Sequence, residues 1–211
     1  MKSRKLILCI LFLFPFILFL SEYIVFRFWD TCNIRVLDSV ILQNGDLVLR
    51  RGISIESFAV VKAEKNSYFS HIGLIIMERG KPYVIHAEPG ESPFKNDPVK
   101  KEPLRYFLQT GKASHFAIYR SHLDQKGLNR VIAQARLFYL QKCRFDNNYD
   151  LTTDHNLYCS ELILKSYRQG NQSINSLLRQ LEEVNIVLVR KKILMPGAFI
   201  NSSLFYKICS R

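Results

Sequence analysis

The chain has 211 residues, of which 48% are hydrophobic and 23% charged, a composition that excludes a disordered protein and allows one folded domain behind an apolar N-terminal segment. Its formal net charge of +12 either attracts acidic partners, such as anionic lipid headgroups or a wall polymer, or reflects a basic but unspecialised surface. The short basic runs do not alternate with aromatic residues, so we expect no nucleic-acid partner.

Residues 1–29 predict a membrane anchor. Three basic residues among the first five precede an apolar run at Leu6–Leu20, which resumes at Tyr23–Phe28. The whole stretch approaches the roughly 20 residues that span a bilayer. No small-residue cleavage pattern follows it, which favours an uncleaved N-terminal transmembrane helix over a removed signal peptide. The basic N-terminal side predicts that residues 30–211 lie outside the cytoplasm, in the periplasm or the extracellular space.

The remaining chain predicts an α+β domain, because strands and helices are grouped along it. A short strand at 47–50 follows Gly45, and two apolar strands flank Arg79-Gly80, which is a turn signal for a hairpin. The predicted elements, in chain order, are strands at 47–50, 71–77, 82–88 and 115–120, an amphipathic helix at 128–142, and a helix at about 157–169 capped by Asp154 or Asn156 and ended by Gly170.

Cys159 lies in the first turn of the last predicted helix. Free N–H groups at a helix start favour a thiolate, and a neighbouring histidine would lower the pKa of the cysteine further. Cys159 also shares a helical face with Leu162 and Ile163, which is typical of a small core residue. The helix alone therefore leaves two interpretations open, a nucleophile or a core side chain.

The hairpin bears on this choice. If Arg79-Gly80 is a two-residue turn, Glu78 pairs with Lys81, and His71, His86 and Glu88 point to one face. A cysteine nucleophile needs a base and a third group that orients the base, and this cluster offers both. The same three side chains could instead bind zinc.

Two further patterns carry less weight. The acidic segment Asp146–Asp154 lacks the glycine and the terminal glutamate of an EF-hand, so a calcium loop is disfavoured. A disulfide between Cys32 and Cys209 is permitted in an oxidising compartment, although spacing alone does not establish it.

Four motifs follow one another in the order of a known family: Gly-Asp-Leu-Val at 45–48, Ser-His-Ile-Gly at 70–73, Tyr-Val-Ile-His-Ala at 83–87 and Tyr-Cys-Ser-Glu-Leu at 158–162. This order resembles the YiiX-like branch of the NlpC-type cysteine hydrolases, which have papain-like folds circularly permuted so that the histidine precedes the cysteine. The resemblance covers most of residues 40–205. It implies a permuted papain-like α+β fold, with an antiparallel sheet packed on helices.

The resemblance also implies roles for individual residues. His71 corresponds to the family's base and Cys159 to its nucleophile. The third position is usually glutamate in YiiX-like proteins, but His86 holds it here, as in the distantly related lecithin:retinol acyltransferases, so the orienting residue is either His86 or Glu88. The family implies hydrolysis or transfer at an amide or ester carbonyl of a peptide, cell-wall or lipid substrate, without a metal or organic cofactor. The competing hypothesis is a non-catalytic binding module that retains the fold.

Overall fold

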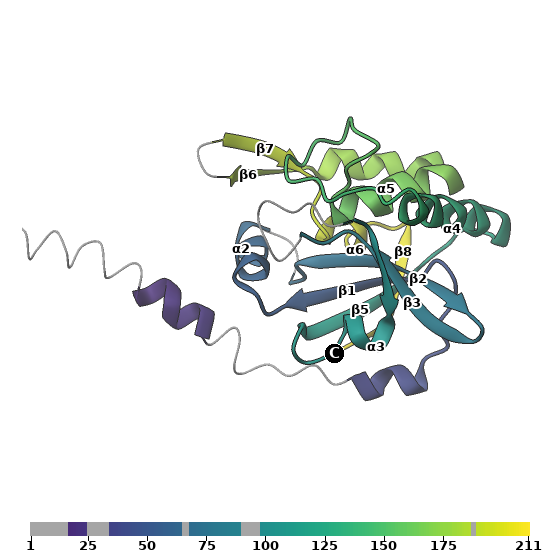
Figure 1. Ribbon diagram of the computed structural model, residues 1–211, viewed down its shortest axis with the longest axis horizontal. Helices are drawn as coiled ribbons and strands as arrows, with labels where there is room; N and C mark the ends of the chain where they lie inside the picture. The colour runs from purple at the N-terminus through teal and green to yellow at the C-terminus, as the bar shows by residue number, and fades with distance from the viewer. Residues whose placement is uncertain (1–16, 25–33, 65–67, 90–97, 187–188) are drawn as a thin grey trace, which may run out of the picture.

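The computed structural model describes residues 17–24, 34–64, 68–89, 98–186 and 189–211. A six-stranded antiparallel sheet, in the order β4-β3-β2-β1-β5-β8, forms the centre of the domain (Figure 1). Its strands are β1 (Leu47–Gly52), β2 (His71–Glu78), β3 (Lys81–His86), β4 (Lys100–Pro103), β5 (Ala113–Ser121) and β8 (Phe205–Ser210). A separate hairpin consists of β6 (Glu182–Ile186) and β7 (Val189–Ile193).

Helices cover both faces of the large sheet. On one face, α4 and α5 pack against alternate strand residues such as Leu47, Ile72 and Ile85, because a strand directs successive side chains to opposite sides. On the other face, η1 and α3 cover Val48, Ile75 and their neighbours. The helical elements are η1 (Ile34–Ser39), α2 (Ile55–Ala63), α3 (Leu104–Phe107), α4 (Gln125–Leu140), α5 (Cys159–Gly170), η2 (Gln172–Gln180) and α6 (Gly197–Ile200). The predicted α+β class, with an antiparallel sheet on helices, is confirmed.

The predicted hairpin register is confirmed. Glu78 pairs with Lys81 and Leu74 with Ile85, so the turn holds two residues. Arg79 and Gly80 both have positive φ, of 50° and 75°, as a two-residue turn with the right-handed twist of the strands requires. This turn fixes which β2 and β3 side chains share a face.

Gly73 permits close packing at the open end of the hairpin. A Cβ built on Gly73 would lie 2.4 Å from Val84 Cγ1 and 3.2 Å from His86 Cβ. Any larger residue would therefore displace β3 and the His86 side chain. The side chains of Val84 and His86 on β3 therefore fill the space above Gly73.

Several boundaries differ from the sequence predictions. Helix α4 begins three residues earlier than predicted, because the Asp124 carboxylate accepts a hydrogen bond from the Gly127 amide and caps it. Helix α5 begins at Cys159, with Tyr158 as its N-cap, and neither Asp154 nor Asn156 caps it. Strand β4 is not among the strands that the sequence predicts, because the prolines at 93, 98 and 103 are typical of a loop.

The described part of the N-terminal segment is a short helix at residues 17–24, which lies beside α2 (Figure 1). The Phe19 and Tyr23 rings contact Phe58, at centroid distances of 5.1 and 6.1 Å, and Glu22 forms an ion pair with Lys62 at 2.6 Å. Among the described residues, no helix has the length and apolar character needed to cross a membrane. Most of the predicted anchor, residues 1–16 and 25–29, lies outside the described residues, as does Cys32 of the suggested disulfide.

Candidate active site

Two histidines meet at the open end of the hairpin. His71 begins β2 and His86 ends β3, and Nε2 of His71 lies 2.9 Å from Nδ1 of His86. Their rings are nearly perpendicular, with centroids 5.1 Å apart, and both contact the Phe107 ring. Because His86 is fully buried and His71 is 7% exposed, each ring is held in place by packing as well as by their shared hydrogen bond.

A third residue, Glu102 on β4, extends this pair. Its Oε1 lies 3.4 Å from Nε2 of His86, within ion-pair distance, and its carboxylate also pairs with Lys112 at 3.3 Å. Glu102 is not predicted from the sequence, because nothing in Lys-Lys-Glu-Pro marks a strand that pairs with β3. The register that pairs His86 with Lys100 and Val84 with Glu102 is the only signal, and it exists only in the folded sheet.

Both imidazoles are held in the neutral form. Burial lowers the pKa of His71 well below its usual value, and the positive charge of Arg50 lowers it further. Burial also lowers the pKa of His86, against the opposing effect of its contact with Glu102. A neutral imidazole has one ring nitrogen with a lone pair, so either ring is equipped to accept a proton at neutral pH.

Glu88 lies near the histidines but has other partners. Its carboxylate pairs with the buried Arg50 guanidinium and lies 3.6 Å from Lys100 Nζ. Arg50 in turn donates a hydrogen bond of 2.8 Å to the Phe107 carbonyl and lies over that ring. The Arg50 charge, followed by His71, lowers the pKa of Glu88 to about 2 against the effect of burial, so Glu88 is ionised. Of the two candidates for the orienting position, only His86 has a hydrogen bond to His71 among the contacts observed.

Cys159 begins α5, which packs against β2. Glu161 Oε2 accepts a hydrogen bond of 3.3 Å from the Tyr158 amide, which closes the start of the helix. Cys159 is partly exposed as a residue, but its sulfur is enclosed by protein atoms and contacts the Ile72 and Ser160 amides. Ile72 directly follows His71, so the sulfur lies at the end of β2 from which the histidine projects. The structure thus joins the two motifs that the sequence separates by 88 positions.

The predicted low pKa of Cys159 is wrong for the chain without substrate. Burial raises the pKa of the thiol above its usual value, and hydrogen bonds from the Ile72 and Ser160 amides only partly oppose this. Burial also keeps His71 neutral, so the thiol and the imidazole are both uncharged without substrate. Among the contacts of the described residues, the His71 ring meets His86 and Phe107, and the sulfur meets the backbone beside it. The sequence reasoning counted the helix start and the histidine but not the loss of solvent around the sulfur.

A buried carboxyl group adjoins the sulfur. Glu64 is 6% exposed, its Oε1 accepts a hydrogen bond of 2.6 Å from the Gly197 amide, and its Oε2 is buried without a hydrogen-bond partner. Burial raises the pKa of Glu64 to about 8, so this side chain is protonated at neutral pH. When Glu64 is ionised, its negative charge raises the pKa of Cys159. Glu64 is therefore close enough to the thiol to interact with it electrostatically.

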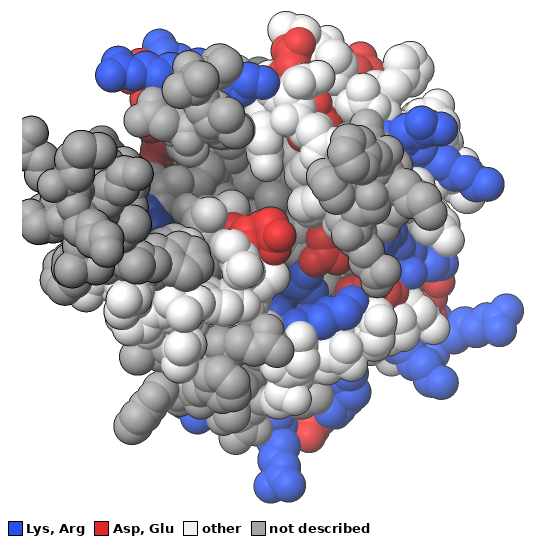
Figure 2. Space-filling view, turned by 60° about the vertical axis from the view of Figure 1, so that its left-hand side comes forward, with Lys and Arg blue, Asp and Glu red and all other residues white. Residues whose placement is uncertain are grey.

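A cavity of about 230 Å³ lies next to the Glu64 contact. Ala198, which follows the Gly197 partner of Glu64, lines it together with the mostly polar side chains of Gln180, Leu181, Glu182 and Asn201. Figure 2 shows the side of the molecule that carries α2 and the β6–β7 hairpin, where acidic side chains lie in a hollow with basic ones beside them and around its rim. This side therefore offers polar groups to a ligand.

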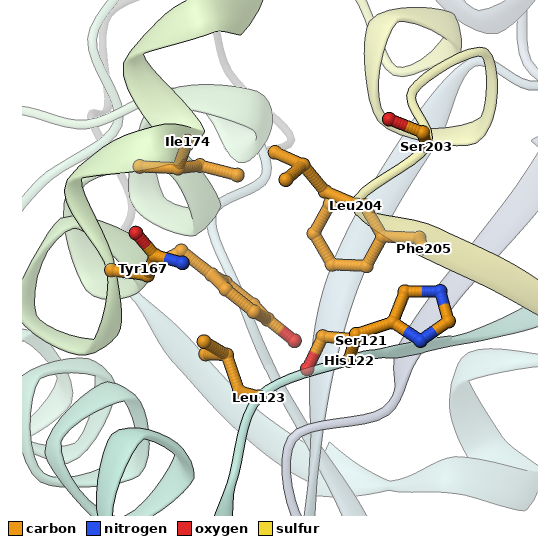
Figure 3. A pocket seen from close by; sticks show the side chains of 9 residues that line it. Ser121, His122, Leu123, Tyr167, Ile174, Ser203, Leu204 and Phe205 are labelled. Carbon is orange, nitrogen blue, oxygen red and sulfur yellow. The ribbon is translucent and has the colours of Figure 1, made fainter.

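A second cavity, of about 120 Å³, lies elsewhere (Figure 3). Tyr167 and Phe205 line it, with Ser121 and His122 at one side, and no predicted catalytic residue reaches it. Tyr167 is eight residues after Cys159 on α5, about 12 Å along the helix axis. Its hydroxyl donates a hydrogen bond of 2.6 Å to the Gly45 carbonyl, which ties α5 to the sheet. This cavity is separate from the cysteine and the histidines.

The fold and the order of its residues define a class: a permuted papain-like protein, in which the histidine strand precedes the cysteine helix. A family model described as permuted papain-like amidase enzyme, YaeF/YiiX, C92 family, matches residues 41–204. The chain belongs to this family, and the predicted YiiX-like assignment is confirmed. The family points to a cysteine hydrolase of the amidase or peptidase type.

Among solved structures, the chain is similar to the metalloprotein YiiX from Escherichia coli O157:H7. The two share 20% sequence identity with a TM-score of 0.61, over 80% of this chain and 97% of that one. This likeness shows the fold. No curated protein matches the sequence.

The description of that neighbour as a metalloprotein makes a metal site worth testing on this chain. Within the described ranges, no group of three or more His, Cys, Asp or Glu side chains is arranged to hold a metal ion. The facing nitrogens of His71 and His86 are 2.9 Å apart and share a hydrogen bond, which leaves no room for an ion between them. Glu88 pairs with Arg50 instead. The zinc interpretation of these three residues therefore does not fit.

Proposed function

We propose that the chain is a cysteine hydrolase that cleaves an amide or ester bond, with Cys159 as nucleophile, His71 as base and His86 as the residue that orients the base. The contact between the Cys159 sulfur and the Ile72 amide, one residue from His71, carries this proposal. The hydrogen bond between His71 and His86 supports the third role. Since Nε2 of His71 is engaged with His86, its Nδ1 is the nitrogen left for the thiol.

The reaction begins from the neutral pair. As Sγ of Cys159 attacks the substrate carbonyl, its proton moves to Nδ1 of His71 and an S–C bond forms. The carbonyl oxygen becomes an oxyanion, and the Cys159 backbone N–H at the start of α5 is placed to donate to it. The C–N or C–O bond then breaks, and the leaving group takes the proton from His71.

The second half regenerates the enzyme. Water gives a proton to Nδ1 of His71 and attacks the thioester carbonyl, and the acid is released as the sulfur recovers a proton. If an acceptor alcohol or amine attacks in place of water, the same residues carry out acyl transfer. His86 accepts a hydrogen bond from His71 throughout, which stabilises the imidazolium that forms.

The polar cavity beside Glu64 favours a peptide or cell-wall amide over an acyl chain as substrate. Gln180, Glu182 and Asn201 supply hydrogen-bonding groups of the kind that recognise an amide backbone. The exposed apolar residues of the helix at 17–24, including Ile17, Leu18 and Ile24, support placing the domain at a membrane surface. A reporter fused after Arg211 is expected to be active only outside the cytoplasm, and activity inside would contradict this placement.

The function is tested with an activated ester, p-nitrophenyl acetate, and mass spectrometry of the whole chain. We expect an acetyl group on Cys159 during turnover, no adduct in Cys159→Ser, and a loss of turnover of at least about 1,000-fold in both Cys159→Ser and His71→Ala. Cys209→Ser is the matched control and retains activity. A chain that binds ligands but never forms the adduct is a non-catalytic module, and that result overturns the proposal.

A further inference from the structure

The side chains of His71, His86 and Glu102 form a series of contacts. The carboxylate of Glu102, at one end of this series, determines which ring nitrogens carry a proton. Nε2 of His71 and Nδ1 of His86 lie 2.9 Å apart, and Nε2 of His86 lies 3.4 Å from Oε1 of Glu102. The three residues come from β2, β3 and β4, which are neighbours in the sheet. The His71–His86 contact is a hydrogen bond with one proton between the two nitrogens. Nε2 of His86 has no hydrogen-bond partner among the described residues, and the Glu102 carboxylate is the acceptor within ion-pair distance of it, so the charge of Glu102 bears on which nitrogen of His86 carries the proton.

Glu102 is the ionised end of this series. Its contacts with His86 and Lys112 lower the pKa of its carboxyl group, against the opposing effect of burial. Lys112 also lies over the Tyr106 ring, 3.7 Å from its centroid, which holds the ammonium group beside the carboxylate. An ionised carboxylate only accepts hydrogen bonds, so the proton between Glu102 and His86 belongs to the imidazole.

The remaining protons follow from the neutrality of the rings. With its single proton on Nε2, neutral His86 has a lone pair on Nδ1 and accepts a hydrogen bond there. His71 must then donate from Nε2, which leaves the lone pair of neutral His71 on Nδ1. The opposite arrangement would put a proton on Nδ1 of His71 and remove its capacity to accept one from a thiol.

We propose that Glu102 is a positioning residue that sets the tautomers of both histidines, acting through His86 to keep Nδ1 of His71 unprotonated. This inference rests on the proposed function, because it assigns the thiol proton to Nδ1. Where a carboxylate contacts the catalytic base directly, that one residue both orients the base and supplies the negative charge. Here His86 contacts the base, and Glu102 supplies the negative charge one residue further away. The arrangement also stabilises the His71 imidazolium after proton transfer, since its Nε2–H still faces an acceptor.

The tautomers are measured directly by ¹⁵N NMR of the full chain labelled at histidine, with signals assigned from His71→Gln and His86→Gln. At neutral pH we expect a protonated Nε2 and an unprotonated Nδ1 in both rings. A proton on Nδ1 of His71 in the unsubstituted chain overturns the proposal, whatever the activity. This measurement needs no substrate and no variant of Glu102.

The effect on the nucleophile is measured with iodoacetamide, which alkylates the Cys159 sulfur. Glu102→Gln keeps the size of the side chain but can donate as well as accept, so it no longer selects one tautomer. We expect the ¹⁵N signals to show mixed tautomers and alkylation at pH 7 to slow by about 10- to 100-fold, with little change at a pH high enough to ionise the thiol unaided. A purely structural role of Glu102 would slow alkylation equally at both pH values or not at all.

Glu78→Gln is the matched control. Glu78 lies on the same hairpin and has its own ion pairs with Lys101 and Arg136, at 3.0 and 3.5 Å, but no contact with either histidine is among those observed. It is expected to leave both the tautomers and the alkylation rate unchanged. If Cys159 reacts readily and Glu102→Gln behaves like Glu78→Gln, the proposal is wrong while the hydrolase function stands. If the tautomers are as expected but Cys159 never acylates, the hydrolase function fails and the tautomer assignment stands.

Discussion

Two clusters of ionisable side chains are built in opposite ways. The histidine cluster consists of His71 and His86 at the end of the β2–β3 hairpin and Glu102 on β4. The helix cluster consists of the buried Glu161 and Lys165 on α5 and the exposed Asp154 in the loop before it. In the helix cluster, Lys165 Nζ is 2.8 Å from Asp154 and 2.9 Å from Glu161, and it also donates to the Thr153 carbonyl, so its positive charge is matched by carboxylates.

In the histidine cluster, by contrast, the imidazoles of His71 and His86 are both neutral. Burial lowers the pKa of His71 and His86, and one carboxylate at the edge sets the direction of the hydrogen bonds. The difference separates two uses of buried polar groups. Opposite charges in direct contact fix the backbone around them, here the loop that leads into α5. Neutral imidazoles in series leave a lone pair available for proton transfer.

The largest stability effect is expected in the helix cluster. Burial raises the pKa of Glu161 to about 7 against the effect of Lys165, so Glu161 is ionised above that pH. Lys165→Met leaves this fully buried carboxylate without its cation, and at pH 8 the loss of one partner of a buried pair costs about 3 kcal/mol. Urea unfolding measures the change. Lys192→Met, which removes an exposed lysine, is the control and should change stability by less than about 0.5 kcal/mol. A small effect of Lys165→Met would mean that the helix cluster is not structural.

A catalytic effect without a comparable loss of stability is expected in the histidine cluster. His86→Ala removes the acceptor for Nε2–H of His71 and should slow acylation by about 100-fold, near 2.7 kcal/mol in activation free energy. Glu88→Ala should slow it less, since Glu88 pairs with Arg50 and Lys100. Burst kinetics with p-nitrophenyl acetate compare the two variants. A larger effect of Glu88→Ala would move the orienting role to that carboxylate.

Glu64 belongs to neither cluster and represents a third case, a buried carboxyl group with no ion pair among the described residues. Its pKa of about 8 in the folded chain exceeds the usual 4.5, so the unfolded chain ionises first as the pH rises. Stability is therefore full below pH 4.5 and declines towards pH 8. Glu64→Gln, which keeps the acceptor for the Gly197 amide, should remove this decline and raise stability at pH 8 by about 2 kcal/mol or more. Thermal unfolding at pH 5 and pH 8 measures it, with the exposed Glu56→Gln as control.

The sequence predicted the parts of this site that depend on local pattern. Arg79-Gly80 determines the hairpin register, and that register alone predicts that His71 and His86 share one face. The position of Cys159 at the start of a helix followed from the polar segment before it and the apolar spacing after it. Both are short-range features, for which neighbouring residues determine the conformation.

The parts that the sequence did not predict depend on contacts between distant segments. Glu102 joins the site only because β4 pairs with β3, and the prolines around β4 made the stretch resemble a loop. Asp154 looked like a helix cap, but Lys165 from the second turn of α5 binds it. The raised pKa of Cys159 arises from the packing of β2 and α5 around the sulfur. Burial of this kind cannot be read from residue types and spacing.

The central claim is that His71 removes the proton from Cys159, and the pH dependence of alkylation tests it most directly. Cys159 should react with iodoacetamide faster than the buried Cys143 at pH 7 and should slow at least about tenfold in His71→Ala, because the raised pKa of the thiol leaves little thiolate without a base. At a pH above the pKa of the thiol, the two chains should react alike, since the sulfur then ionises unaided. Equal rates at pH 7 with and without His71, or a Cys159 no more reactive than Cys143, would contradict the account.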